Sequence, residues 1–222
     1  MTKVFYLDAL CFSNGTLFDA AIGRLPYHRK EKLRRIKNTQ GKYLCAGAWL
    51  LLEKALKTFP SYGQDGVLNK TPKGKPFFQN YDSVHFSLSH SGNIALCAVS
   101  DKKIGADIQL IGDFSDGICK KYFSENETDY VLSASSSGEK AERFFRIWTL
   151  KEAFSKMTGD GLSGFKKFSI KSGNEVIAEG ENLPEAFFKE FSIDNYKIAI
   201  CTDGCEDDFE IKKLNLSEIL IN

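Results

Sequence analysis

The expected secondary structure of this chain repeats one order of elements. In each half a strand comes first, a long helix follows, and paired strands come last. In the first half we predict strands at residues 4–10, 84–88 and 94–99 and an apolar helix at 43–56. In the second half we predict strands at 104–110, 168–170, 175–178, 187–193 and 196–202 and a helix at 139–157. This order predicts an α+β fold of two similar halves, residues 1–105 and 106–222, packed together with pseudo-two-fold symmetry.

The segments between these elements carry weaker signals. Glycine, proline and lysine predict a loop at 60–76, and Ser89-His90-Ser91-Gly92-Asn93 predicts a turn. A helix is expected near 124–132, and the serine-rich stretch 133–138 has a linker-like composition.

The composition narrows the class of protein. The chain has 222 residues, of which 42% are hydrophobic and 27% charged, and its net charge is +1. Nothing in these values suggests a nucleic-acid or membrane partner. The sequence has no apolar run long enough for a membrane span and no signal peptide at its N-terminus. We therefore expect a cytoplasmic protein whose six cysteines are free thiols.

Acidic side chains occur on one strand and on the long helix. Asp107 and Gln109 lie two residues apart on the strand at 104–110, so they share a face, although any half-buried strand alternates in this way. Glu152 and Lys156 lie one turn apart on the helix, where a solvated ion pair is the alternative. If the two segments meet in space, they can hold a divalent metal beside phosphate groups.

Three other segments offer groups to an anion. His90 lies among hydroxyl groups in the predicted turn, and Lys75 lies in a stiff Gly-Lys-Pro turn. A basic cluster runs through residues 24–42. A solvated histidine, a surface loop and a solvated basic helix explain the same residues, so none of these segments identifies a function alone.

Together, and in this order, the segments resemble the motifs of the Sfp-type 4′-phosphopantetheinyl transferases. That family carries a Gly-Lys-Pro turn, a Phe-Asn/Ser-x-Ser-His-Ser/Ala segment, a Gly-Ile/Val-Asp-Ile/Val-Glu strand and a Trp/Phe-x-x-Lys-Glu-Ala/Ser-x-x-Lys helix. The matching segments here are Gly74-Lys75-Pro76, Phe86-Ser87-Leu88-Ser89-His90-Ser91, Gly105-Ala106-Asp107-Ile108-Gln109 and Trp148-Thr149-Leu150-Lys151-Glu152-Ala153-Phe154-Ser155-Lys156. The resemblance covers residues 24–170 and is nearer the Trp-Lys-Glu-Ala branch.

The resemblance implies the fold of these transferases and their reaction. As a holo-(acyl-carrier-protein) synthase, the enzyme would move the phosphopantetheine arm of coenzyme A onto a serine of an apo acyl or peptidyl carrier protein. Adenosine 3′,5′-bisphosphate would be released. The sequence leaves open whether the carrier serves fatty acid, polyketide, nonribosomal peptide or lysine-type metabolism. The two similar halves in one chain suggest a monomer with the site at their junction, although the sequence leaves the oligomeric state open.

The resemblance also implies roles for individual residues. Mg²⁺, or Mn²⁺ in its place, would be held by Asp107, Gln109 and Glu152, with Glu152 as the base. Lys156 and His90 would complete the catalytic group. The implied contacts to coenzyme A are Lys75, Ser89, His90 and Lys156, with Lys30, Lys32, Arg35 and Lys42 toward the 3′-phosphate. Residues 112–140 would receive the acidic carrier protein, although ordinary core packing explains that segment equally well.

Gln109 departs from the family pattern, which often has a second acid there. A neutral amide is a weaker Mg²⁺ ligand, so we expect weaker metal binding than at an all-carboxylate site. Two other functions remain as alternatives. One is a non-catalytic coenzyme A or nucleotide-binding module of the same fold, and the other is a different Mg²⁺-dependent phosphate enzyme such as a phosphodiesterase.

Overall fold

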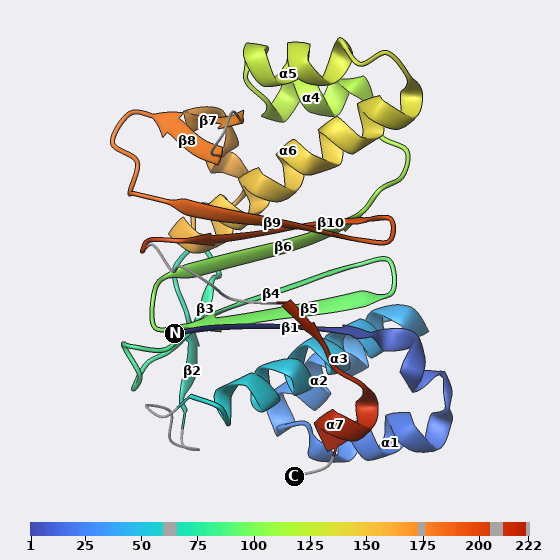
Figure 1. Ribbon diagram of the computed structural model, residues 1–222. Coiled ribbons are helices and arrows are strands. Elements are labelled where there is room, and N and C mark those ends of the chain that lie inside the picture. The colour runs from blue at the N-terminus through green and yellow to red at the C-terminus, as the bar shows by residue number, and fades with distance from the viewer. Residues whose placement is uncertain (60–65, 173–175, 205–210, 221–222) are drawn as a thin grey trace.

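The computed structural model describes residues 1–59, 66–172, 176–204 and 211–220. Two sheets face each other through an apolar layer to which strands of both contribute. Helices cover the outer side of each sheet (Figure 1). The arrangement confirms the predicted α+β class.

The first half contains a four-stranded sheet and the helices that cover it. Its elements are β1 (Thr2–Asp8), the short helix η1 (Ala9–Ser13), α1 (Gly15–Arg24), α2 (Tyr27–Arg35), α3 (Thr39–Leu56), β2 (Leu68–Lys70), β3 (Pro76–Phe78), β4 (His85–Ser91) and β5 (Ile94–Ser100). β2 and β3 form a separate hairpin. The sheet order is β11-β1-β5-β4, because β11 (Ile211–Lys213) returns from the end of the chain to pair with β1.

The second half contains a three-stranded sheet of order β6-β10-β9. Its elements are β6 (Ile104–Leu110), α4 (Asp116–Tyr122), α5 (Glu125–Leu132), α6 (Ser137–Thr158), the short helix η2 (Leu162–Lys167), β7 (Phe168–Ser172), β8 (Val176–Gly180), β9 (Phe187–Ile193) and β10 (Tyr196–Thr202). α6 begins at the cap Ser136, whose side chain accepts from Glu139 N, and ends at Gly159 in the left-handed conformation. The last helix, α7 (Leu216–Leu220), packs on the first half.

The two halves correspond strand by strand. β1, β4 and β5 begin at Thr2, His85 and Ile94, whereas β6, β9 and β10 begin at Ile104, Phe187 and Tyr196. Each strand thus starts 102 residues after its counterpart, and the antiparallel registers agree as well. The equal strand positions and registers are what the predicted pseudo-two-fold relationship between the halves requires. The proposed boundary between residues 105 and 106 falls inside β6.

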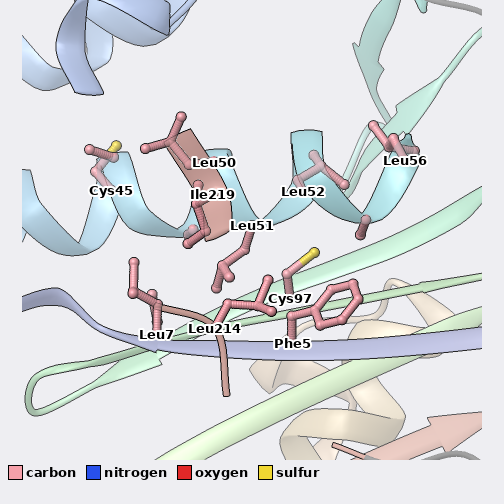
Figure 2. Packing of buried hydrophobic residues seen from close by; sticks show 14 of the residues in the cluster. Phe5, Leu7, Cys45, Leu50, Leu51, Leu52, Leu56, Cys97, Leu214 and Ile219 are labelled. Atoms are coloured by element: carbon pink, nitrogen blue, oxygen red, sulfur yellow. The ribbon is translucent and has the colours of Figure 1, made fainter. Parts of the chain in front are cut away.

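The core of the first half lies between α3 and its sheet. Leu51 of α3 points toward the strands that carry Phe5, Leu7 and Cys97 (Figure 2). Leu214 and Ile219 from the C-terminal segment complete the cluster. Because α3 is buried along most of its length, its sequence reads as nearly continuous apolar residues.

Several local predictions need correction. The turn expected at residues 89–93 is wrong in part, because Ser89, His90 and Ser91 belong to β4 and the turn begins only at Gly92. The loop expected at 60–76 contains β2, and its residues 60–65 lie outside the described part of the chain. Residue 175 of the strand expected at 175–178 also lies outside it, and β8 begins at Val176.

Cys11, Cys45, Cys97, Cys119 and Cys201 are free thiols, and all but Cys11 are buried. Cys205 lies outside the described residues. Among the helices that the structure describes, none is long and apolar enough to cross a membrane.

Candidate active site

The strand and helix singled out in the sequence meet in space. The carboxylate of Asp107 on β6 is 1% exposed and accepts hydrogen bonds at 2.6 Å from both Lys156 Nζ and Ser89 Oγ. Lys156 Nζ also donates to Ser89 Oγ at 2.9 Å and to the Ala106 carbonyl at 3.2 Å. The site therefore draws on α6 and β6 of the second half and on β4 of the first.

Gly105 permits the close packing of β6 against α6. A Cβ at this position would lie 1.9 Å from the carbonyl oxygen of Ala153 and 2.4 Å from the nitrogen of Met157. Any side chain would therefore push the helix away from the strand. Glu152 and Lys156 each come one position before one of these contact residues on α6. The close packing at Gly105 therefore brings both side chains toward Asp107.

Glu152 lies half-buried beside Asp107. Burial raises the pKa of Glu152, the nearby Asp107 carboxylate raises it further, and Lys156 partly opposes both effects. Two neighbouring carboxylates are a donor set that suits a hard divalent cation, and the lysine beside them suits a phosphate group.

The third predicted ligand is an amide and does not complete an acidic cluster. Gln109 Nε2 donates to Asp107 Oδ2 at 3.0 Å, so its amide oxygen must turn before it can face a metal bound to Asp107. Within the described residues, no three His, Cys, Asp or Glu side chains are grouped so that they could hold a metal.

The first half has no counterpart of this polar pair. The positions 102 residues before Asp107 and Gln109 are Phe5 and Leu7, which belong to the apolar core under α3 (Figure 2). The pseudo-symmetry therefore supplies two similar scaffolds but only one set of strand carboxylate and amide.

Basic side chains lead away from the site into the first half. His90 and Lys32 are exposed at the surface, and partial desolvation lowers the pKa of His90, with Lys156 and Lys32 lowering it further. Partial desolvation likewise lowers the pKa of Lys32, with Arg29 and Lys70 as additional positive neighbours. Basic side chains therefore gather on this part of the surface, which favours a bound anion with several charges.

The other predicted contacts are placed differently. Lys75 Nζ donates to the Met157 carbonyl at 2.7 Å and to the Ile104 carbonyl at 3.4 Å, and burial lowers its pKa to about 8. Its ammonium group therefore caps the end of α6, and it must leave these carbonyls to meet a phosphate. Lys30 Nζ donates to the Gly23 carbonyl at 3.1 Å. Arg35 lies exposed on α2 and Lys42 lies half-buried in the first turn of α3.

Comparison with known proteins identifies the family. Residues 103–201 match the model of the 4′-phosphopantetheinyl transferase superfamily. A 4′-phosphopantetheinyl transferase of Bacillus subtilis is 30% identical over 206 residues, which span 87% of this chain and 90% of the relative. The chain belongs to the 4′-phosphopantetheinyl transferases.

Other transferases of this family show the same extended similarity. The 4′-phosphopantetheinyl transferase Sfp of Bacillus subtilis (strain 168) is 27% identical, covering 86% of this chain and 88% of the relative. AcpT of Salmonella typhi is 30% identical, with 86% of each chain covered. The protein is thus a transferase of the holo-(acyl-carrier-protein) synthase kind, a family whose members modify a serine of carrier proteins.

Two further basic residues of this transferase, Arg29 and Lys70, lie near Lys32. The Arg29 guanidinium lies 4.7 Å from the centre of the Trp49 ring, and its buried Nε has no hydrogen-bond partner. A sequence signal existed for Arg29, which belongs to the basic cluster. Lys70 is remote in sequence and only the fold brings it near Lys32.

Proposed function

We propose that this transferase moves the 4′-phosphopantetheine arm of coenzyme A onto a carrier-protein serine and releases adenosine 3′,5′-bisphosphate. The observation that carries the proposal is the meeting of Asp107, Glu152 and Lys156 at one end of a series of cations. The carboxylates suit a metal beside a pyrophosphate, and the cations suit the remaining phosphate of coenzyme A.

The proposed reaction is one phosphoryl-group transfer. The serine oxygen forms a bond to the β-phosphorus of coenzyme A, and the bond from that phosphorus to the bridging oxygen breaks. Glu152 takes the serine proton, directly or through a water, as a carboxylate beside the reacting phosphate. Lys156 stabilises the charge that develops on the leaving phosphate. Mg²⁺, held by Asp107 and Glu152, would neutralise the pyrophosphate.

The rest of coenzyme A extends over the first half. His90 and Lys32 lie toward the 3′-phosphate, with Arg29 and Lys70 beyond them as members of the same positive region. Ser89 orients the groups that meet the pyrophosphate, since its hydroxyl contacts both Asp107 and Lys156.

The carrier protein would approach over α4. Lys120 and Lys121 are exposed on this helix and suit an acidic partner, whereas Phe123 is buried. The ring of Tyr122 lies 5.7 Å from that of Trp148, so α4 is fixed to α6 one turn before Glu152. One chain supplies both halves of the site, so we also propose that the monomer is active.

One experiment separates this function from its rivals. The protein is incubated with coenzyme A, Mg²⁺ and an apo carrier protein, and the carrier is then weighed by mass spectrometry. A gain of one phosphopantetheine arm with release of adenosine 3′,5′-bisphosphate supports the proposal. Coenzyme A binding without transfer indicates a binding module, and hydrolysis without a carrier product indicates a phosphodiesterase.

Two variants test the assignment of Glu152. Glu152→Gln is expected to abolish transfer while leaving the protein folded. Glu142→Gln is the matched control, because Glu142 lies on the same helix but pairs with Lys197 on β10. Full activity of Glu152→Gln would remove Glu152 from the mechanism.

A further inference from the structure

β6 is an edge strand whose open edge faces β4. Among the strands that the structure describes, the sheet order β6-β10-β9 leaves one side of β6 without a strand partner in its own sheet. β4 lies beside it, at the edge of the other sheet (Figure 1). Backbone N–H groups along such a covered edge need acceptors, because leaving them unpaired is costly.

Three serine hydroxyls of β4 accept hydrogen bonds from this edge. The acceptors and their backbone donors are Ser87 with Ala106 at 2.9 Å, Ser89 with Ile108 at 3.4 Å, and Ser91 with Leu110 at 2.9 Å. Each pair is separated by 19 residues, so the two strands run parallel and every second residue contributes a contact. We call these three contacts the serine seam.

The middle contact of the serine seam is shared with the active site. Ser89 Oγ also donates to Asp107 and accepts from Lys156, and its bond to the backbone of β6 is the longest of the three. Ser87 and Ser91 make the two shorter bonds on either side. They hold the strands together while Ser89 serves the catalytic groups.

We infer that Ser87 and Ser91 are positioning residues for phosphopantetheinyl transfer, an inference that rests on the proposed function. They fix β4 against β6. That spacing sets the distance between the cations of the first half and the Asp107, Glu152 and Lys156 group of the second. Coenzyme A contacts both halves at once, so its binding and reaction depend on this distance. The affinity for a ligand that contacts only one half does not depend on this distance.

The test compares two ligands on the same variants. Ser91→Ala and Ser87→Ala/Ser91→Ala remove seam hydroxyls, and calorimetry measures the binding of coenzyme A and of adenosine 3′-phosphate, which lacks the pyrophosphate. We expect coenzyme A affinity and the rate of carrier modification to fall about ten-fold or more, since small misplacements cost rates of this size. Binding of adenosine 3′-phosphate should stay within about two-fold of wild type, because its contacts lie in one half.

Two controls separate positioning from a general loss of structure. Thr2→Val removes a buried hydroxyl that donates to Ser100 Oγ at 2.8 Å inside the first sheet, away from the seam, and should leave both ligands unaffected. Ser91→Thr keeps the seam hydroxyl and should restore coenzyme A binding. If the double variant does not unfold cooperatively, Ser91→Ala and Ser91→Thr decide the question.

The possible outcomes are distinct. Equal weakening of both ligands, or wild-type behaviour of folded alanine variants, overturns the positioning role while the transferase activity stands. A wild-type protein that neither binds coenzyme A nor modifies a carrier overturns the proposed function, and the inference with it. Selective loss of coenzyme A binding with rescue by threonine supports both.

Discussion

The ammonium group of Lys151 lies 2.9 Å from a carboxylate oxygen of Glu127, and both side chains are almost entirely excluded from solvent. The same carboxylate accepts from the backbone nitrogens of Ser124 and Ile170, and Lys151 also donates to the Phe168 carbonyl. This buried pair therefore joins α5, α6 and β7 next to Glu152.

Removing one member of the pair should be strongly destabilising. Lys151→Met leaves a buried carboxylate without its counter-ion, and we expect a loss of about 3–5 kcal/mol in the free energy of unfolding, measured with urea. The double variant Glu127→Gln/Lys151→Met should lose less, because no unpaired charge remains. The control is Arg146→Met on the same helix, whose partner Glu190 is partly exposed. It should lose about 1 kcal/mol or less, and an equal loss in Lys151→Met would contradict the prediction.

Gly105→Ala should separate β6 from α6. The new methyl group would overlap the Ala153 carbonyl, so the helix must move and carry Glu152 with it. We expect a stability loss of about 1–3 kcal/mol and a larger proportional loss of transfer rate. Gly138→Ala is the control, because no neighbouring atom lies within 4 Å of its added Cβ. Comparable losses in both variants would show that the tight crossing is unimportant.

The order of elements was predictable from sequence because it depends on local periodicity. The helices at α3 and α6 and the paired strands of both halves follow from apolar spacing, and the cap residues of α6 fix its ends. The active-site pair Asp107 and Lys156 was suggested by motifs, but only the fold shows their contact.

One error concerns β4. Ser89, His90 and Ser91 have a turn-like composition, yet their segment is a strand because it pairs with β5 across the turn at Gly92 and Asn93, and its serine hydroxyls accept hydrogen bonds from β6. The contact of Lys75 with the Met157 carbonyl at the end of α6 could not be predicted, because the two residues are 82 positions apart. A role of Lys75 in phosphate binding stays a prediction.

The pKa of Glu152 should respond in opposite directions to its two neighbours. In metal-free protein, Asp107→Asn should lower it by removing a negative charge, and Lys156→Met should raise it by removing a positive one. Carbon-13 NMR of labelled glutamate carboxyl groups measures both shifts. Shifts in the same direction would show that the three groups do not interact as the structure indicates.

The raised pKa of Glu152 also has consequences for pH dependence. In metal-free protein the Glu152 carboxyl should titrate at a higher pH than an ordinary glutamate, and carbon-13 NMR measures this titration. The free energy of unfolding also depends on pH through this shift, and it decreases as pH rises. The folded state binds this proton more tightly than the unfolded state, so the contribution of Glu152 is full below the unfolded pKa and is lost as pH rises through the folded pKa. The difference in unfolding free energy between wild type and Glu152→Gln isolates it.

Gln109→Glu should tighten metal binding at the proposed site. In the wild-type protein the Gln109 amide donates to Asp107, which supports the carboxylate but offers a neutral ligand. A glutamate adds a charge that favours a divalent cation, and without metal it repels Asp107. We expect the variant to be less stable than wild type in the presence of chelator and to gain more stability on addition of Mg²⁺.

Thermal unfolding across a Mg²⁺ titration, with calorimetry of the metal alone, measures both effects. Lys197 lies opposite position 109 on β10. The double variant Gln109→Glu/Lys197→Met therefore tests whether the new carboxylate pairs with Lys197 rather than with the metal. Identical Mg²⁺ affinities for wild type and Gln109→Glu would mean that residue 109 does not face the ion.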